Sequence, residues 1–363
     1  MTTSRIDAID FWRGIVLAII FVNHIPGNIL GSFTPRNFGF SDASEAFVFI
    51  SGLSVALAYS RRFKGGGALY ASLPLIRRAF RLYFAHLALT ASALLLFGLA
   101  TLVTGLDGLL ADHGCANAFL DPMRGFFGIV TLSEQISYFN ILPLYVVLLI
   151  LAPPLFVIGV RNRFSMLLIS FCLYLIGRWA DPYLRASSDQ ATWYFNPAAW
   201  QLMFVIGIFV GLVLQERGVT FCRRVYRASL AFSVVAAIIV SNVLGLVPGL
   251  GDQVGEFLDW NKTNLGAVRI FAFLALAYSI YCSGLTARLR PMLIYPAFSL
   301  LGRQALPVFC LGSLLSAFGQ ILNETWISSP VLDVLFVAAG LCILLLSAKA
   351  LERRRELNWA VAG

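Results

Sequence analysis

Charged residues are scarce in this chain of 363 residues. They make up only 12% of it, whereas hydrophobic residues make up 59% and the mean hydropathy is +0.82. A soluble globular domain carries about 25% charged residues, so the composition argues against a soluble protein. Long apolar runs recur from end to end, which predicts an all-α polytopic membrane protein with a single domain over residues 1–363.

The amino terminus lacks the features of a cleavable signal peptide. The segment MTTSRIDAID is polar and contains two acids, and no small-residue cleavage site follows the apolar run after it. We therefore expect the first hydrophobic run to be retained as a membrane helix.

Cysteine and histidine are also rare, with six and three residues. Most cysteines lie in apolar runs, where they act as small apolar side chains, so no disulfide framework is expected. The histidines have no metal-ligand spacing, and KGGGALY at residues 64–70 lacks the lysine-serine ending of a phosphate-binding loop. We expect neither a metal site nor a tightly bound cofactor. No internal repeat is visible, which weakens the case for an inverted-repeat transporter.

A helix needs about 20 apolar residues to cross a bilayer. The sequence predicts about ten such transmembrane helices, of which the second and fifth are short and the third and ninth are long. They lie at residues 10–30, 43–60, 76–103, 139–159, 164–179, 198–215, 229–247, 265–283, 294–320 and 331–349.

Positive charge is concentrated on one side of the predicted bundle. Nineteen of the 27 lysines and arginines lie in loops after even-numbered spans, at the termini or at the start of the third span. The positive-inside rule then makes both termini cytoplasmic. The net charge of +9 is explained by this topology. The expected surroundings are therefore a lipid bilayer, with no nucleic-acid partner.

The first predicted span carries two ionisable residues, Arg13 and His24, eleven positions apart. Eleven residues make about three helical turns, so both side chains share one face, roughly 16 Å apart along the axis. Asp10 lies on the same face. Pro26 and Gly27 then end the helix, because proline cannot donate a backbone hydrogen bond. Either Arg13 snorkels to the headgroups and His24 only ends a helix, or both mark a site in which histidine moves a proton.

Two acids, Asp42 and Glu45, stand three residues apart at the start of the second span. This spacing favours a capping box, with Asp42 as the N-cap residue and Glu45 reaching back. A carboxylate here could also hydrogen-bond to His24 and raise its basicity. Glu45 is preferred for that role because Asp42 is the better cap. Ser51 and Gly52, about two helical turns after Glu45, allow a close helix–helix approach.

Several longer strings of the sequence resemble known families. An arginine, ten residues and a histidine in the first span, followed by FVFISG, resemble the membrane acyltransferase-3 superfamily. Four strings resemble the OpgC family of osmoregulated periplasmic glucan succinyltransferases: DFWRGIVLAIIFVNHIPGN, RNFGFSDASEAFVFISG, YFNILPLY and LGRQALPVFCLG. The match is strong over residues 5–60 and recurs at 138–145 and 301–312.

The resemblance implies a ten-helix enzyme of the bacterial inner membrane. Such an enzyme would pass a succinyl group from cytosolic succinyl-CoA to hydroxyls of a periplasmic glucan, and its arginine and histidine fall on Arg13 and His24. Arg13, beside Asp10, would meet the donor at the inner mouth, and His24 would take the proton from the attacking hydroxyl. Direct transfer is preferred, although the sequence does not exclude an acyl-histidine intermediate.

Further cations are candidates for binding the two substrates. CoA phosphates could meet a basic cluster that the positive-inside rule also explains: Arg61, Arg62, Arg77, Arg78 and Arg81. The free carboxylate of a succinyl group could meet one of four arginines of the outer half: Arg36, Arg124, Arg178 or Arg269. Arg36 is favoured, together with its neighbour Asn37, because both belong to the strong match.

Four polar residues interrupt or open predicted spans and could line the acyl channel or tie helices together. They are Tyr138, Asn140, Arg303 and Gln304. Aromatic residues near the outer loop ends suit either a sugar site or an interfacial belt.

Two rival functions remain open. The nearest is acetyl transfer to another surface glycan. The other is an ion-coupled transporter that uses the arginine, the histidine and the acids as a relay.

Overall fold

The computed structural model describes residues 7–65, 67–106, 108–186, 193–216, 218–243, 245, 249–325 and 329–362, and all regular structure in these ranges is helical. The longer helices are α1 (Asp7–Asn23), α2 (Ala43–Gly65), α3 (Ala68–Thr104), α7 (Ile141–Arg161), α8 (Arg163–Ala186), α9 (Pro197–Glu216), α10 (Arg223–Ser241), α12 (Ala267–Ser283), α14 (Ile294–Arg303), α15 (Ala305–Thr325) and α16 (Pro330–Ala362). The shorter ones are η1 (Ile29–Phe33), η2 (Pro35–Asn37), α4 (Gly108–Asp112), α5 (Ala116–Leu120), α6 (Pro122–Val130), α11 (Leu250–Phe257) and α13 (Leu285–Leu289).

Eight helices are long and apolar enough to cross a membrane, namely α2, α3, α7, α8, α9, α10, α15 and α16. Helices α1 and α12, with 17 residues each, occupy two further predicted spans. The predicted all-α class is therefore confirmed for the part of the chain that the structure describes, and eight of its helices suit a membrane-spanning protein. The count of ten spans and the cytoplasmic location of both termini stay predictions. The predicted second span is longer than expected, because α2 continues to Gly65.

The predicted ninth span, 294–320, is divided into two helices. Helix α14 ends at Arg303 and α15 begins at Ala305, with Gln304 between them in a non-helical conformation (φ −103°, ψ 35°). Arg303 and Gln304 do interrupt this span, as the sequence predicts. The apolar composition continues across the break, so hydropathy by itself does not reveal that the chain changes direction there.

Helix α1 ends at Asn23, earlier than the predicted boundary at residue 30. Pro26 has no amide hydrogen to donate to the carbonyl of Val22. The side-chain amide of Asn28 donates to that carbonyl instead, at 2.9 Å, and also bonds to the carbonyl of Ile25. This side-chain cap leaves His24 in the turn just beyond the helix.

Glycines permit two close helix contacts near the centre of the bundle. A Cβ atom on Gly302 of α14 would lie 1.8 Å from the backbone oxygen of Asp10 in α1. A Cβ atom on Gly52 of α2 would lie 2.0 Å from the backbone oxygen of Phe204 in α9. The close approach predicted at Gly52 is therefore confirmed, and its partner is α9.

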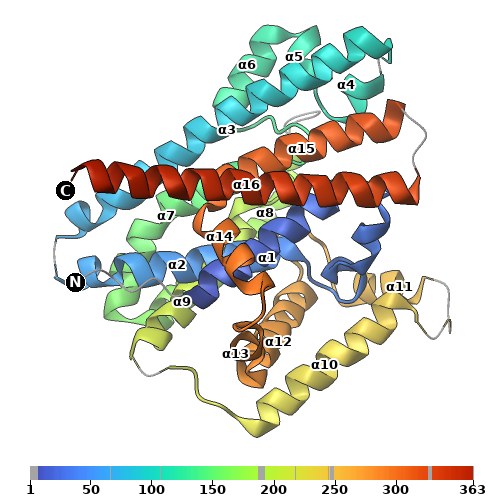
Figure 1. The fold of residues 1–363 in the computed structure, drawn as a ribbon. Helices are drawn as coiled ribbons and strands as arrows, with labels where there is room; N and C mark the ends of the chain where they lie inside the picture. The colour runs from blue at the N-terminus through green and yellow to red at the C-terminus, as the bar shows by residue number, and fades with distance from the viewer. Residues whose placement is uncertain are drawn as a thin grey trace.

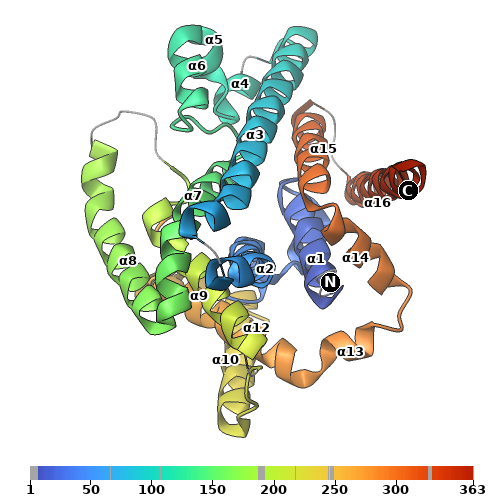
Figure 2. The same ribbon diagram turned by 90° about the vertical axis from the view of Figure 1, so that its left-hand side faces the viewer.

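The helices form a central group surrounded by more exposed ones (Figures 1 and 2). In Figure 2, α1, α2 and α9 lie at the centre, with α3, α8, α10 and α16 around them. Helices α2, α7 and α9 bury most of their membrane-length segment, whereas α3, α8, α10 and α16 leave most of theirs uncovered. The uncovered surface includes many large apolar side chains. Such a surface suits contact with lipid tails.

The long segment between α3 and α7 folds into α4, α5 and α6, which lie beside α3 at the top of Figure 1. The hydroxyl of Tyr83 in α3 donates to the carbonyl of Val130 at 2.8 Å. His113 Nε2 lies 2.9 Å from Glu324 Oε1 near the end of α15. These contacts pack the segment against α3 and link it to α15.

Candidate active site

His24 lies in the turn after α1, where its imidazole stacks on the ring of Tyr138. The ring centroids are 4.7 Å apart and the planes are inclined by 15°. Tyr138 precedes α7, more than a hundred residues along the chain. The fold therefore brings together two residues that the sequence singled out for different roles.

A buried amide fixes the backbone around both rings. Gln320 of α15 is 2% exposed, and its Nε2 donates to the carbonyl of His24 at 2.6 Å. Its Oε1 accepts a hydrogen bond from the hydroxyl of Ser137, at 3.1 Å. Ser137 adjoins Tyr138, so a single side chain holds both halves of the stacked pair. Sequence reasoning missed Gln320; the only signal was one amide in an apolar run.

The predicted capping box at the start of α2 is confirmed. Glu45 Oε2 accepts from the backbone nitrogen of Asp42 at 2.8 Å, and Asp42 Oδ1 accepts from the backbone nitrogen of Ser44 at 2.7 Å. These bonds satisfy amide groups that have no partner within the helix.

Both acids of the capping box also pair with cations. Arg269 Nε donates to Glu45 Oε1 at 2.6 Å, and Lys262 Nζ lies 2.5 Å from Asp42 Oδ2. Arg269 Nη2 is 3.4 Å from the same Asp42 oxygen. Glu45 is fully buried and Arg269 is 7% exposed. A buried charge is tolerated only when it is paired, so this cluster joins the start of α2 to α12.

Trp200 of α9 holds the segment that carries Lys262. Its indole Nε1 donates to the carbonyls of Lys262 and Thr263, at 3.0 and 3.1 Å. Arg269 is one of the four outer arginines that the sequence pattern singles out, whereas Lys262 is not assigned a role by that pattern. Their pairing with the capping box depends on a contact more than 200 residues along the chain, which no local pattern reveals.

Burial and the charges of this cluster together set the protonation states of Asp42 and His24. Burial alone would raise the pKa of Asp42, but Lys262 and Arg269 outweigh it and hold this pKa well below its usual range. For His24, burial has the largest effect and Lys262 adds to it, so the pKa falls to about 3, although Asp42 acts in the opposite direction. The imidazole is therefore neutral at pH 7, the form that accepts a proton.

The predicted hydrogen bond in which Glu45 accepts from His24 is not found among the described residues. The oxygens of Glu45 are used by Arg269 and by the backbone of Asp42. Asp42 influences His24 through its charge. Stacking on Tyr138 and the Gln320 contact hold the histidine in place of a carboxylate, because Arg269 and the Asp42 amide occupy the two Glu45 oxygens.

Arg13 lies on the same helix as His24 and links three helices. Its guanidinium lies 2.8 Å from Asp10 Oδ1 and 3.3 Å from the carbonyl oxygen of Gly302 in α14, and it also bonds to the hydroxyl of Ser54 in α2. The pairing of Asp10 with Arg13 agrees with the predicted shared face. Arg13 therefore lies in a polar contact between α1, α2 and α14.

The predicted phosphate-binding arginines have different surroundings. Arg78 is half-buried and lies over the ring of Tyr145, 5.5 Å from its centroid. The other four are exposed on α2 and α3: Arg61, Arg62, Arg77 and Arg81.

The remaining predicted residues divide between the site and the scaffold. Arg36 is exposed, and its charge acts on His24. Asn37 donates to the carbonyl of Gly31 at 2.7 Å and so holds the turn that carries Arg36. Arg303 pairs with Glu352 of α16 at 2.9 Å, which favours the interpretation that it ties helices together. Two further amides, Asn140 and Gln304, are buried next to helix ends.

Comparison with known proteins supports one family. A family model described as "OpgC protein" matches residues 5–356, nearly the whole chain. Neither the curated proteins nor the solved structures compared with the chain gave a match. The extent of the family match shows that the chain belongs to the OpgC family.

Proposed function

We propose that this chain is a bacterial inner-membrane O-acyltransferase that moves a succinyl group from cytosolic succinyl-CoA to hydroxyls of periplasmic glucans. Membership of the OpgC family supports an acyltransferase-type function in glucan modification. The eight membrane-length helices support a bilayer location. The arginine–histidine arrangement on the first helix also agrees with the resemblance to the acyltransferase-3 superfamily.

One observation carries the proposal: a neutral histidine is held in place just beyond the end of the helix that also carries a half-buried arginine. His24 and Arg13 are eleven residues apart, which is about 16 Å along the axis. A long, slender pantetheine arm suits that separation. The donor would enter past Arg13 and present its thioester near His24, on the periplasmic side.

The chemistry assigned to His24 is general base catalysis. A glucan hydroxyl oxygen attacks the thioester carbonyl carbon while one ring nitrogen of His24 takes the hydroxyl proton. The carbon–sulfur bond then breaks, an ester is formed, and the imidazolium returns the proton to the CoA thiolate. Stacking on Tyr138 uses the face of the imidazole and leaves the edge, which carries both nitrogens, for the transfer.

Arg36 is the proposed contact for the distal carboxylate of the succinyl group. It is exposed near His24, and no described ion pair occupies it. Lys262 and Arg269 are instead paired with Asp42 and Glu45. A cation without an internal counter-ion can accept a new carboxylate at lower cost.

The decisive experiment is mass spectrometry of periplasmic glucans from cells with and without this protein. A mass increase equal to a succinyl group supports the proposal. A mass increase equal to an acetyl group would show that the donor carries acetyl in place of succinyl. Unmodified glucans together with substrate flux in sealed vesicles and no CoA consumption would point to a transporter. His24→Ala at equal expression should give unmodified glucans; wild-type modification by this variant would remove the proposed base.

A further inference from the structure

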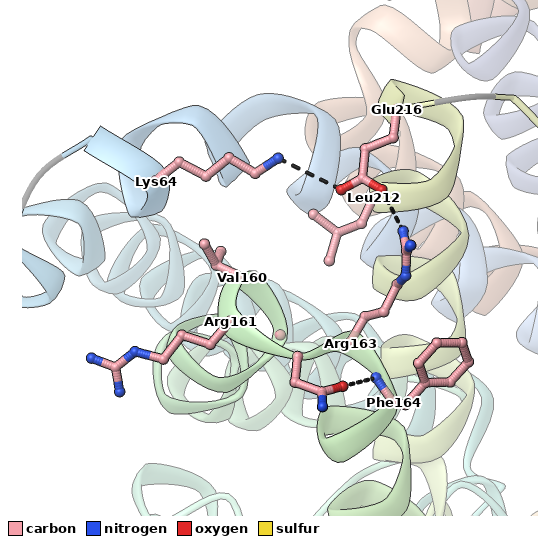
Figure 3. A pocket seen from close by; sticks show the side chains of 9 residues that line it. Lys64, Val160, Arg161, Arg163, Phe164, Leu212 and Glu216 are labelled. Carbon is pink, nitrogen blue, oxygen red and sulfur yellow. Dashed lines mark hydrogen bonds and ion pairs between the residues drawn. The ribbon is translucent and has the colours of Figure 1, made fainter.

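A pocket of about 260 Å³ lies at the end of α2 that is opposite to Asp42 and Glu45 (Figure 3). It is formed where α2, α7 and α9 end and α8 begins. Its polar and aromatic lining consists of Lys64, Arg161, Asn162, Arg163, Phe164 and Glu216. None of these residues belongs to the candidate active site described above.

Cations outnumber acids in this pocket by three to one. Arg163 Nη1 lies 2.5 Å from Glu216 Oε2, and Lys64 Nζ lies 3.7 Å from Glu216 Oε1. Figure 3 shows both cations directed at Glu216, whereas Arg161 extends in another direction. The Glu216 carboxylate is therefore an anion of the protein itself that lies between two cations. The pocket still keeps a net positive charge.

The remaining walls define the kind of ligand that fits. Phe164 is 64% exposed beside Arg163, whose guanidinium carbon is 5.9 Å from the ring centroid. Val160 and Leu212 add apolar surface. An anion with an adjoining flat or apolar part matches these walls better than a bare inorganic ion does.

The backbone amides of Phe164 and Ser165 at the start of α8 are not available to a ligand. Asn162 Oδ1 already accepts from the backbone nitrogens of Phe164 and Ser165, at 2.9 and 3.2 Å. The side chains of Lys64, Arg161 and Arg163 remain as the donors. Arginine forms paired hydrogen bonds with phosphate oxygens, and lysine adds a compact charge.

We propose that this pocket binds a phosphate-bearing ligand, whose phosphate takes the place of the Glu216 carboxylate between Lys64 and Arg163. The ligand is either a soluble nucleotide or a phospholipid headgroup, since both join a phosphate to a flat or apolar part. The inference concerns binding alone and does not depend on the proposed transfer activity.

The test measures binding to the purified full-length protein in two arms. Adenosine 3′,5′-bisphosphate represents the soluble source and is titrated by calorimetry in detergent. Phosphatidylglycerol represents the lipid source and is compared with phosphatidylcholine by native mass spectrometry from nanodiscs. The double variant Arg161→Gln/Arg163→Gln should weaken binding of the preferred ligand by about tenfold or more, because charge-assisted hydrogen bonds are lost. Arg227→Gln, which removes an exposed arginine of α10, is the matched control.

Glu216→Gln gives the sharper result because its sign is opposite. Removing the competing carboxylate should tighten binding several-fold, an effect that misfolding does not produce. A response only to the bisphosphate identifies a nucleotide site, and a response only to phosphatidylglycerol identifies a lipid site. If neither ligand responds to Glu216→Gln, or if the double variant behaves like Arg227→Gln, the proposal is overturned. His24→Ala should bind as the wild type does, which separates this result from any failure of the transfer reaction.

Discussion

At the start of α2, Glu45 is fully buried and Asp42 has a side chain that is only 11% exposed, and each pairs with a cation. At the other end of the same helix, Lys64 is 46% exposed and shares one carboxylate with Arg163. The first group has balanced charge and little contact with solvent. The second has excess positive charge and an opening. Breaking a buried ion pair strongly destabilises a protein, whereas an exposed ion pair contributes little to its stability. The comparison indicates that the first group maintains the geometry around His24, and that the second is available to bind a ligand.

The largest expected effect is on chemistry at His24. His24→Gln should lower acyl transfer by about 10²–10⁴-fold, the usual contribution of a general base. CoA release from succinyl-CoA in the presence of glucan, measured on purified protein in detergent, checks this. Near-normal transfer by a well-folded variant would mean that the histidine only ends a helix.

The next largest effect concerns the buried pair of Glu45 and Arg269. Arg269→Met leaves the Glu45 carboxylate buried without its closest cation and should lower the unfolding free energy by about 3–5 kcal/mol. Thermal unfolding in detergent measures this change. The double variant Glu45→Gln/Arg269→Met should recover part of it, because no unpaired charge is left; an equally unstable double variant would contradict the ion-pair explanation.

A substitution at Gln320 tests whether the reaction requires this side chain to hold His24 and Tyr138 in place. Gln320→Met should lower kcat by about 10–100-fold and leave KM for the donor nearly unchanged, since small misplacement of a catalytic group affects the chemical step. Steady-state kinetics measure both constants. Asn323→Ala is the matched control, because Asn323 donates to the carbonyl of Pro26 from the same helix but does not reach Ser137. Equal loss in both variants would argue for a general structural role.

The pH dependence should respond to Lys262. Burial and Lys262 lower the pKa of His24 to about 3, so wild-type transfer should stay nearly constant as the pH falls from 8 to 5. Lys262→Met removes a charge that opposes protonation of His24. The Asp42 carboxylate, which favours protonation, then acts without that opposing charge, so the pKa of His24 rises. The acidic limb of the kcat/KM profile should therefore move to higher pH. Lys262→Arg keeps the charge and should behave like the wild type; a shift in that variant too would point to a packing effect.

The smallest effect is expected at the exposed end of α2. Lys64→Met should change the unfolding free energy by less than about 1 kcal/mol, because its contact with Glu216 is long and solvated. The same thermal unfolding measurement as for Arg269→Met provides the comparison. A loss as large as that of Arg269→Met would show that the two ends of α2 do not differ in the proposed way.

Much of the site could be predicted where the relevant residues are close in the sequence. Helical periodicity puts Asp10 beside Arg13, and the spacing of Asp42 and Glu45 predicts the capping box, because both depend only on local backbone geometry. Proline at position 26 indicates the end of α1. The boundary itself is earlier than predicted, since it depends on how the Asn28 side chain caps the open carbonyls.

The contacts between distant segments could not be predicted in this way. Nothing near Glu45 in the chain indicates that Arg269 will take its oxygen, and nothing near His24 indicates Gln320. The division of the predicted span 294–320 at Gln304 has the same origin, because α14 turns to pack its Gly302 against α1.

The amino-acid sequence by itself determined the helical membrane class, the arginine–histidine spacing on α1 and the cap of α2, because hydropathy and hydrogen bonding within one or two turns suffice for these. Only the tertiary structure decided which residue stacks on His24, which cations neutralise the two acids, and where cations remain in excess. Those outcomes depend on which helix surfaces pack together, and the packing is set by the shape and burial of the whole bundle.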